Sequence, residues 1–253
     1  MNNIAISLGN ITKRFQISDD PSQQNDQIRD GYFYALDDIS LSIESGSCTI
    51  IAGANGSGKS LLMSIIAGLE DPTSGIVITN KRIGLVFQDA DAQILGETPK
   101  EDIAFGPRNL GLSKKEISIK VDGALAKTGL IQKANFPSRS LSGGEKRRLA
   151  TAGILAMNAE IIIFDEPYAN LDYQGILQVN NLFKELLSDA KTVIILTHEI
   201  EKCMALADKF IVLFKGKKVV DGKAEDALLV DIESYGIHHP LKKKVFKLED
   251  LLW

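Results

Sequence analysis

The sequence predicts an α/β fold with a mostly parallel sheet, an antiparallel β subdomain before it and a helical subdomain inserted into it. Three observations lead to this prediction. Apolar and polar residues alternate near the N-terminus, uninterrupted β-branched segments recur later, and one long stretch contains only helix-like and loop-like sequence. The 253 residues, 44% of them hydrophobic, supply enough apolar side chains for a sizeable core.

The N-terminal strands are indicated by an alternation with a period of two residues. Apolar side chains occupy every second position in residues 4 to 8 and again in residues 39 to 43. This period is typical of half-buried antiparallel strands. Residues 18 to 31 are polar and contain almost no core-forming side chain, which predicts an exposed insertion in a loop.

The central sheet is indicated from residue 47 onward. The segment CTIIA at residues 48 to 52 is followed by a glycine loop and by the helix-like sequence KSLLMSIIAGL. Residues 161 to 165 and 192 to 197 are short, β-branched and uninterrupted, as strands buried on both faces of a parallel sheet are. We expect helical stretches after each of them.

The boundaries follow from the same patterns. Residues 89 to 157 are predicted to form the inserted helical subdomain, within one domain that covers residues 1 to 230. Residues 209 to 222 predict a hairpin with its turn near Lys215, Gly216 and Lys217. Residues 231 to 253 form a C-terminal tail for which the pattern predicts no fold.

Composition excludes several functional classes. The 33 acidic and 29 basic residues give a formal net charge of −4, which disfavours a protein that neutralises nucleic-acid phosphates. Cys48 and Cys203 lie far apart without a CxxC pair, which predicts buried thiols in a reducing cytosol. No apolar run approaches the roughly 18 residues of a membrane helix, and no signal-peptide pattern is present, so we expect membrane contact only through a partner.

A phosphate-binding loop is predicted between an apolar strand and a helix. The pattern GxxxxGK[ST] is met by Gly53, Ala54, Asn55, Gly56, Ser57, Gly58, Lys59 and Ser60. Glycines allow the backbone N–H groups to face phosphate oxygens, Lys59 supplies positive charge, and the Ser60 hydroxyl holds Mg²⁺. The alternative is a glycine turn before a helix with an accidental lysine.

Two carboxylates stand where the strand at residues 161 to 165 ends. Asp165 is predicted to organise the Mg²⁺ shell, and Glu166 to polarise the attacking water as a general base. An Asp-Glu pair also occurs as a cap of a following turn. The phosphate loop favours the catalytic interpretation.

A second anion site is predicted at residues 141 to 145, LSGGE. Ser142, Gly143 and Gly144 stand at the N-terminus, here called the mouth, of a helix with an apolar stripe. The same pattern also suits a simple helix cap. The segment resembles the LSGGQ signature of ABC ATPases, with Glu145 in place of glutamine. The resemblance implies a phosphate-loop NTPase core that uses ATP and Mg²⁺, with the signature of one subunit completing the ATP site of the other.

Smaller features resemble the same family. Gln88 resembles the glutamine loop, which implies a Mg²⁺ contact and a link to the transport partner. Residues 169 to 172, ANLD, resemble the D-loop at the dimer interface. His198 resembles the switch histidine that contacts the γ-phosphate, although a capping or core histidine is the alternative. The resemblance thus implies Lys59, Glu166 and His198 as catalytic residues.

The aromatic that stacks on adenine is expected on an early strand. Phe15, in the sequence ITKRF, is the first choice, followed by Tyr34 and Phe33. Aromatic core packing is the alternative for each of them.

Residues 88 to 94 and 101 to 112 resemble energy-coupling-factor ATPases, which drive uptake of vitamins or of cobalt and nickel. The resemblance implies a peripheral protein at the cytoplasmic face of the membrane. Its implied partners are a second ATPase subunit of the same or similar sequence, a transmembrane coupling protein and a separate substrate-binding membrane component. His238 and His239 are read as incidental, and no nucleic acid is expected.

Three alternatives remain at this point. They are an ABC ATPase for lipoprotein extraction or cell division, a soluble ATPase of DNA repair, and a small-molecule kinase. DNA-repair ATPases carry long coiled coils or zinc modules, neither of which this sequence indicates, and a kinase would not need the signature at Ser142.

Overall fold

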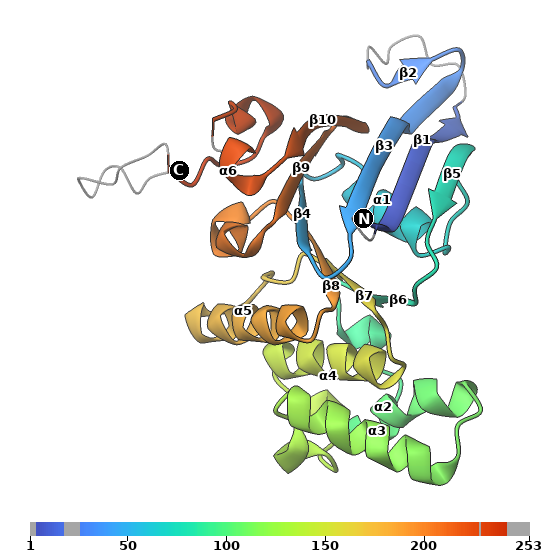
Figure 1. Ribbon diagram of the computed structural model, residues 1–253, viewed down its shortest axis with the longest axis vertical. Helices are drawn as coiled ribbons and strands as arrows, with labels where there is room; N and C mark the ends of the chain where they lie inside the picture. Colours follow the sequence, from blue (N-terminus) through green and yellow to red (C-terminus); the bar gives the residue numbers. More distant parts are fainter. Residues whose placement is uncertain (1–3, 18–25, 228, 242–253) are drawn as a thin grey trace. The chain divides into compact units, whose positions relative to one another are not determined.

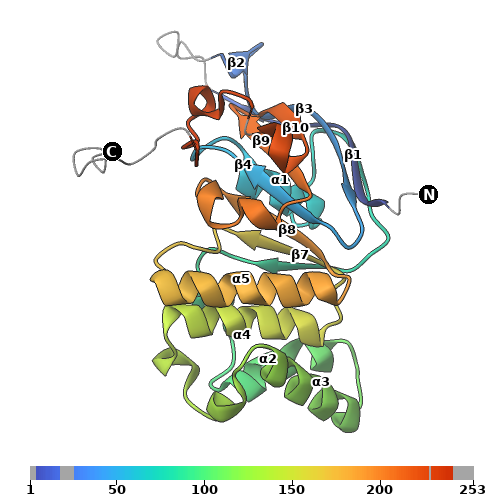
Figure 2. The same cartoon turned by 60° about the vertical axis from the view of Figure 1, so that its left-hand side comes forward.

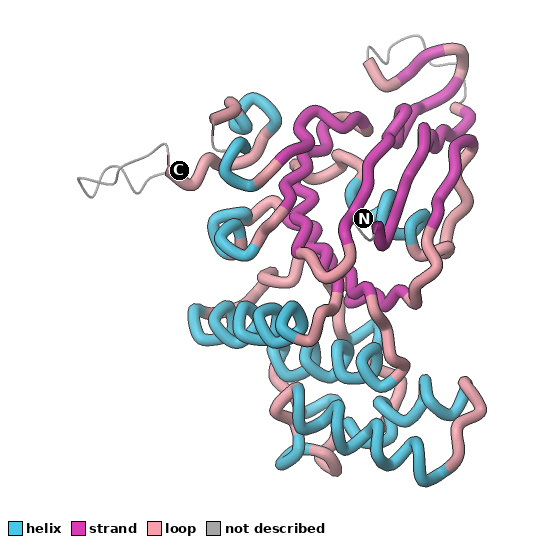
Figure 3. Tube along the Cα trace, viewed as in Figure 1, coloured by secondary structure: helices cyan, strands magenta, loops and turns pink. Residues whose placement is uncertain are grey.

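The computed structural model describes residues 4–17, 26–227 and 229–241. The chain divides into two compact units. A helix-rich unit contains residues 1–5, 44–47 and 79–195, and a strand-rich unit contains residues 6–43, 48–78 and 196–253. Figure 3 distinguishes their helices from their strands by colour.

The strand-rich unit contains an antiparallel sheet, as the N-terminal alternation predicts. Its strands are β1 (Ile4–Gln16), β2 (Ile28–Arg29), β3 (Tyr32–Glu44) and β5 (Ser74–Ile78), in the order β2-β3-β1-β5 (Figure 1). Ile39, Leu41 and Ile43 are buried while the residues between them are partly exposed. The side chains of β3 therefore alternate between a core face and an outer face.

Strand β2 corrects the prediction for the polar insertion. Residues 18–25 lie outside the described residues, but Ile28–Arg29 pair antiparallel with β3 and are not a loop. The Arg29 guanidinium donates to both carboxylate oxygens of Asp37, 2.8 Å for the Nη1 to Oδ2 contact, and lies 3.6 Å from the ring centroid of Tyr34. These contacts hold the end of the insertion against the sheet.

The same unit contains strands β4 (Cys48–Ala52), β9 (Lys209–Phe214) and β10 (Lys217–Gly222). Strand β9 pairs parallel with β4 and antiparallel with β10. Lys215 and Gly216 connect the hairpin with φ of 47° and 73°. Positive φ at both turn residues matches the twist of the flanking strands, and the predicted hairpin is confirmed.

The helix-rich unit contains β6 (Ile83–Val86) and β7 (Ile161–Asp165), which are parallel neighbours, and β8 (Thr192–Thr197), which reaches the boundary between the units. All residues of β7 and β8 are buried, as their uninterrupted apolar sequences predict. The helix expected directly after β8 is absent from the described residues. The short 3₁₀ turns Ile200–Lys202 and Met204–Leu206 stand there instead.

Four helices belong to this unit: α2 (Pro99–Asn109), α3 (Lys114–Lys127), α4 (Gly143–Ala156) and α5 (Tyr173–Ser188). Figure 2 shows α4 beside α5, with α2 and α3 beyond α4. The side chains of Ile103, Leu125 and Leu149 join α2, α3 and α4 in one buried cluster. Each helix begins at a Ser, Thr or Asp whose side chain accepts a backbone N–H, which fixes where the helix starts.

The remaining helices are α1 (Lys59–Ile66), directly after the phosphate loop, and the short α6 (Ala224–Ala227). In the C-terminal tail, residues 232–235 form a 3₁₀ turn, while residues 242–253 lie outside the described residues. Cys48 and Cys203 are both buried, and burial raises the pKa of the Cys48 thiol to about 12. Within the described ranges, no helix has the length and apolar character to cross a membrane.

Candidate nucleotide site

The phosphate loop joins β4 to α1 and is closed by contacts that only glycine permits. A Cβ atom at Gly53 would lie 2.4 Å from the Ser57 Oγ and 2.5 Å from the Leu213 carbonyl oxygen. Gly56 and Gly58 have φ of 78° and 102°, in the left-handed region that disfavours other residues. The backbone of the loop can therefore approach a ligand closely.

Lys59 and Ser57 give this loop the character of an anion site. The Lys59 side chain is buried, and its Nζ donates to the carbonyl oxygens of Gly53 at 2.7 Å and Ala54 at 3.3 Å. The Ser57 hydroxyl is buried without a partner among the described residues. No side chain caps the N-terminus of α1 at Gly58, and a helix N-terminus of this kind favours an anion.

The carboxylate pair lies in the helix-rich unit. Asp165 and Glu166 are 8% and 6% exposed, so both carboxylates are buried where β7 ends. Glu166 has φ of 43°, a strained value for a residue with a side chain. Its carbonyl oxygen accepts the Ala169 N–H at 3.2 Å, which closes the turn that follows. This backbone gives the Glu166 side chain a defined direction.

The signature forms the N-terminus of α4. The Ser142 Oγ accepts the Glu145 N–H at 3.3 Å, and the Ser142 N–H donates to Glu145 Oε2 at 2.9 Å, which is a capping box. Lys133 Nζ donates to Glu145 Oε1 and, with the Ser142 backbone, holds the pKa of Glu145 below its ordinary value. A Cβ at Gly143 would meet nothing within 4 Å, so the helix mouth is open on that side.

Gln88 and His198 follow β6 and β8, and both are exposed. Gln88 lies in the helix-rich unit with the carboxylate pair and the signature, and His198 lies in the strand-rich unit with the phosphate loop. The predicted site residues are thus divided into two sets, one in each unit.

The three candidate aromatics differ in how far their rings are covered. Phe15, on β1, is 46% exposed and has the Lys13 Nζ 5.5 Å from its ring centroid. Tyr34 is 9% exposed and stacked by Arg29, and Phe33 is partly buried. The exposure of its ring favours Phe15 as the residue that stacks on a base.

The donor set suits Mg²⁺. Ser60, Gln88 and Asp165 offer hydroxyl, amide and carboxylate oxygens, the ligands that this hard cation prefers. No group of three or more His, Cys, Asp and Glu side chains suited to a metal occurs in the part of the chain that the structure describes. Mg²⁺ commonly binds through few protein ligands together with substrate phosphates, so each of these residues offers an oxygen of the kind it needs.

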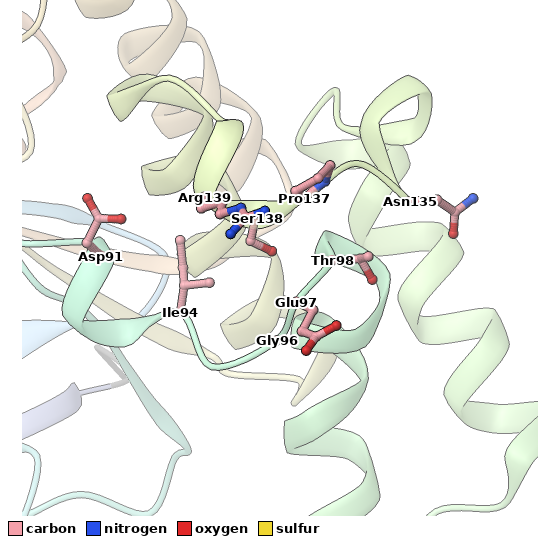
Figure 4. Close-up of a pocket in the computed structure, with 9 residues that line it drawn as sticks. All are labelled: Asp91, Ile94, Gly96, Glu97, Thr98, Asn135, Pro137, Ser138 and Arg139. Carbon is pink, nitrogen blue, oxygen red and sulfur yellow. The ribbon is translucent and has the colours of Figure 1, made fainter.

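Two cavities in the helix-rich unit were not anticipated from the sequence. The larger, of about 480 Å³, lies between the start of α2 and the segment before the signature, and Figure 4 labels its lining residues Asp91, Ile94, Gly96, Glu97, Thr98, Asn135, Pro137, Ser138 and Arg139. The second, of about 330 Å³, is lined by α2 and α4 and includes Leu95, Phe105 and Leu110. All three of these apolar side chains are exposed.

Arg147 was also not identified from the sequence as a residue of interest. It is buried on the same side of α4 as Thr151 and Ile154, at helical spacing. A charged residue within an apolar stripe is the signal that could have identified it.

A phosphate loop of this geometry, in a chain with a strand-end Asp-Glu pair, defines a nucleotide hydrolase of the phosphate-loop class. The family model described as ABC transporter matches residues 36–169, which include the phosphate loop, the carboxylate pair and the signature. The chain belongs to this family of ATP-binding cassette proteins, and it is an ATPase.

Relatives and solved structures agree with this family. The chain is 39% identical over 225 residues to a cobalt import ATP-binding protein of Rhodobacter capsulatus, covering 82% of this chain and 80% of the relative. It is 38% identical over 214 residues to an energy-coupling factor transporter ATP-binding protein of Methanocaldococcus jannaschii, covering 79% and 76%.

Among solved structures, cbiO1 of Clostridium perfringens, part of the ABC transporter complex cbiONQ, matches with a TM-score of 0.78 and 29% identity, covering 94% of this chain and 96% of that one. The dimeric ATP-binding cassette MJ0796, bound to ADP and Pi after hydrolysis, matches with a TM-score of 0.73 and 28% identity, covering 87% and 98%. The predicted fold class is thereby confirmed.

Proposed function

We propose that this chain hydrolyses ATP to power a membrane importer of the energy-coupling-factor type, which takes up a vitamin or a transition metal. The observation that carries the proposal is the complete set of phosphate-loop, carboxylate and signature residues in a chain similar to cobalt-import and energy-coupling-factor ATPases. Substrate selection then belongs to a separate membrane component.

The strand-rich unit supplies the nucleotide-binding residues in this proposal. Lys59 and N–H groups of residues 53 to 60 bind the β- and γ-phosphates, because the loop combines a cation with a helix N-terminus that no side chain caps. Phe15 stacks on the adenine ring. His198 contacts the γ-phosphate.

The helix-rich unit supplies the residues for hydrolysis. Glu166 accepts a proton from the attacking water, a role that suits a carboxylate held by the turn after β7. Asp165 and Gln88 would serve as Mg²⁺ ligands from this unit. When bound, Mg²⁺ neutralises the charge that develops on the phosphates.

A second ATPase subunit of the same or similar sequence completes the site. The mouth of α4 at Ser142, Gly143 and Gly144 presents an open helix N-terminus, and such a terminus favours an anion. In the proposal this mouth meets ATP held by the other subunit. The dimeric state of the similar cassette MJ0796 supports such a pairing.

The apolar cavity between α2 and α4 supports a membrane partner. Phe105 and Leu110, 47% and 46% exposed, lie in its wall, and exposed apolar side chains of this kind mark docking sites. We assign this cavity to a coupling helix of the transmembrane protein, and we propose that the chain lies peripherally at the cytoplasmic face of the membrane.

Affinity purification from the native membrane tests this function. A tagged chain should co-purify with a transmembrane coupling protein and a small substrate-binding membrane protein. Phe105→Asp should release both while ATP binding persists, whereas Ile119→Asp, which changes an exposed apolar residue of α3 outside the cavity, should release neither. Recovery of a nuclease or of DNA in place of membrane proteins would overturn the proposal.

A further inference from the structure

Arg147 is a charged side chain buried inside the helix-rich unit. It is 7% exposed, its Nε has no hydrogen-bond partner, and within the described ranges no Asp or Glu forms an ion pair with it. Burial lowers the pKa of its guanidinium. A buried charge without a counter-charge is costly, so core packing alone does not explain an arginine here.

The guanidinium joins three segments that carry proposed site residues. Its Nη2 donates to the carbonyl oxygen of Gln88 at 3.3 Å and to that of Ala169 at 3.4 Å, and its Nη1 lies 3.5 Å from the same Ala169 oxygen. Arg147 itself belongs to the signature helix α4. The planar guanidinium can donate in these directions together because its donors are fixed in a fork.

One of these contacts leads directly to the proposed general base. Ala169 accepts from Arg147 through its carbonyl and donates its own N–H to the Glu166 carbonyl at 3.2 Å. Glu166 and Asn170 both have positive φ, 43° and 59°. Strained backbone of this kind persists only where the surroundings hold it.

We propose that Arg147 is a positioning residue for ATP hydrolysis. By holding the carbonyls of Ala169 and Gln88, it fixes the turn that directs the Glu166 carboxylate and ties that turn and the Gln88 loop to the signature helix. Arg147 acts through these segments and makes no contact with the nucleotide. The inference rests on the roles proposed above for Glu166 and Gln88.

Arg147→Met tests the inference, since methionine fills much of the same volume without a donor. We expect kcat for ATP hydrolysis to fall by about tenfold or more, because small misplacements of a catalytic group are costly. ATP affinity should stay within about twofold, because the phosphate loop is unchanged. Tm should stay equal or rise, because an uncompensated buried charge is removed. Arg147→Lys keeps the positive charge but has a single donor nitrogen in place of the guanidinium fork, so it should give an intermediate kcat.

Arg82→Met is the matched control. The Arg82 Nη1 also donates to a backbone carbonyl of the helix-rich unit, that of Met157, but this carbonyl belongs to no proposed nucleotide loop. Its kcat should stay within about twofold of wild type.

Hydrogen exchange separates a positioning role from a structural one. In Arg147→Met, the amides of residues 166 to 171 should exchange faster than in wild type although the global Tm is equal to or above that of wild type. An unchanged kcat in the folded variant would overturn the inference, as would a lower Tm with normal turnover per folded molecule. If Arg147→Met does not fold, Arg147→Lys decides by the same measurements. A wild-type chain without ATPase activity would refute the proposed function, while the exchange result would still test whether Arg147 holds the turn.

Discussion

At the scale of single residues, Lys59 has the proposed role of binding the nucleotide and Glu166 that of hydrolysing it. Lys59 lies in a loop whose left-handed φ values occur at Gly56 and Gly58, and Glu166 lies in a turn that is closed by a backbone hydrogen bond. Substitutions that preserve these backbones should therefore separate the two steps.

Lys59→Ala should remove most nucleotide affinity while the fold persists. The substitution deletes a charge-assisted phosphate contact, and its measured effect should be a rise of at least about tenfold in the Kd for ATP by calorimetry. Lys191→Ala is the control, since Lys191 Nζ likewise donates to a backbone carbonyl, that of Ala159 at 2.8 Å, away from the loop. Tight ATP binding by Lys59→Ala would disprove the role of Lys59.

Glu166→Gln should bind ATP normally and hydrolyse it at least about 10²-fold more slowly, the lower range for losing a positioned general base. Glutamine keeps the shape of the buried side chain but is a poor proton acceptor. Single-turnover hydrolysis measures the loss, with Glu160→Gln, an exposed acid before the same strand, as the control. Normal turnover in Glu166→Gln would place the base elsewhere.

At the scale of elements, the N-terminus of α4 combines two functions that oppose each other. Glu145 stabilises the helix through its capping box, yet its negative charge stands where the proposal places a phosphate. The ion pair with Lys133 offsets this charge, and the pKa of Glu145 is accordingly lowered. Glutamine, which the family signature carries here, would cap without the charge.

This arrangement predicts a result for a double-mutant cycle. Lys133→Met should raise the KM for ATP by about fivefold, in line with the modest strength of a partly exposed ion pair. Glu145→Gln should change it little, and the double variant should return close to wild type, because no uncompensated carboxylate remains. If the double variant is as impaired as Lys133→Met, then Lys133 acts by a route other than Glu145.

Elements also show where sequence reasoning succeeds. Sequence patterns predicted strands β7 and β8, the hairpin turn at Lys215 and the glycine-rich phosphate loop. Each of these depends on local residue spacing or on a backbone conformation that particular residue types favour. Strand β2 was not predicted, because it depends on the contacts of Arg29 with Asp37 and Tyr34, which alternation does not encode. Arg147 was missed because its partners are main-chain carbonyls distant in sequence.

At the scale of the whole molecule, the site residues are divided between two compact units, and the signature mouth is open. A chain built in this way suits a dimer in which each ATP contacts a loop from one subunit and a signature from the other. The central claim is therefore that hydrolysis needs both subunits, with Lys59 and Ser142 acting across the dimer.

ATPase activity of two mixed dimers, purified with their membrane partner, tests this claim most directly. Ser142→Arg places a bulky cation at the signature mouth and should block closure on the other subunit's ATP. In the first dimer one subunit carries Ser142→Arg and the other Lys59→Ala. In the second dimer a single subunit carries both changes. Action across the dimer leaves one intact site in the first dimer and none in the second, so we expect activity only in the first. Activity only in the second dimer would show that each signature serves its own phosphate loop, which would contradict the account.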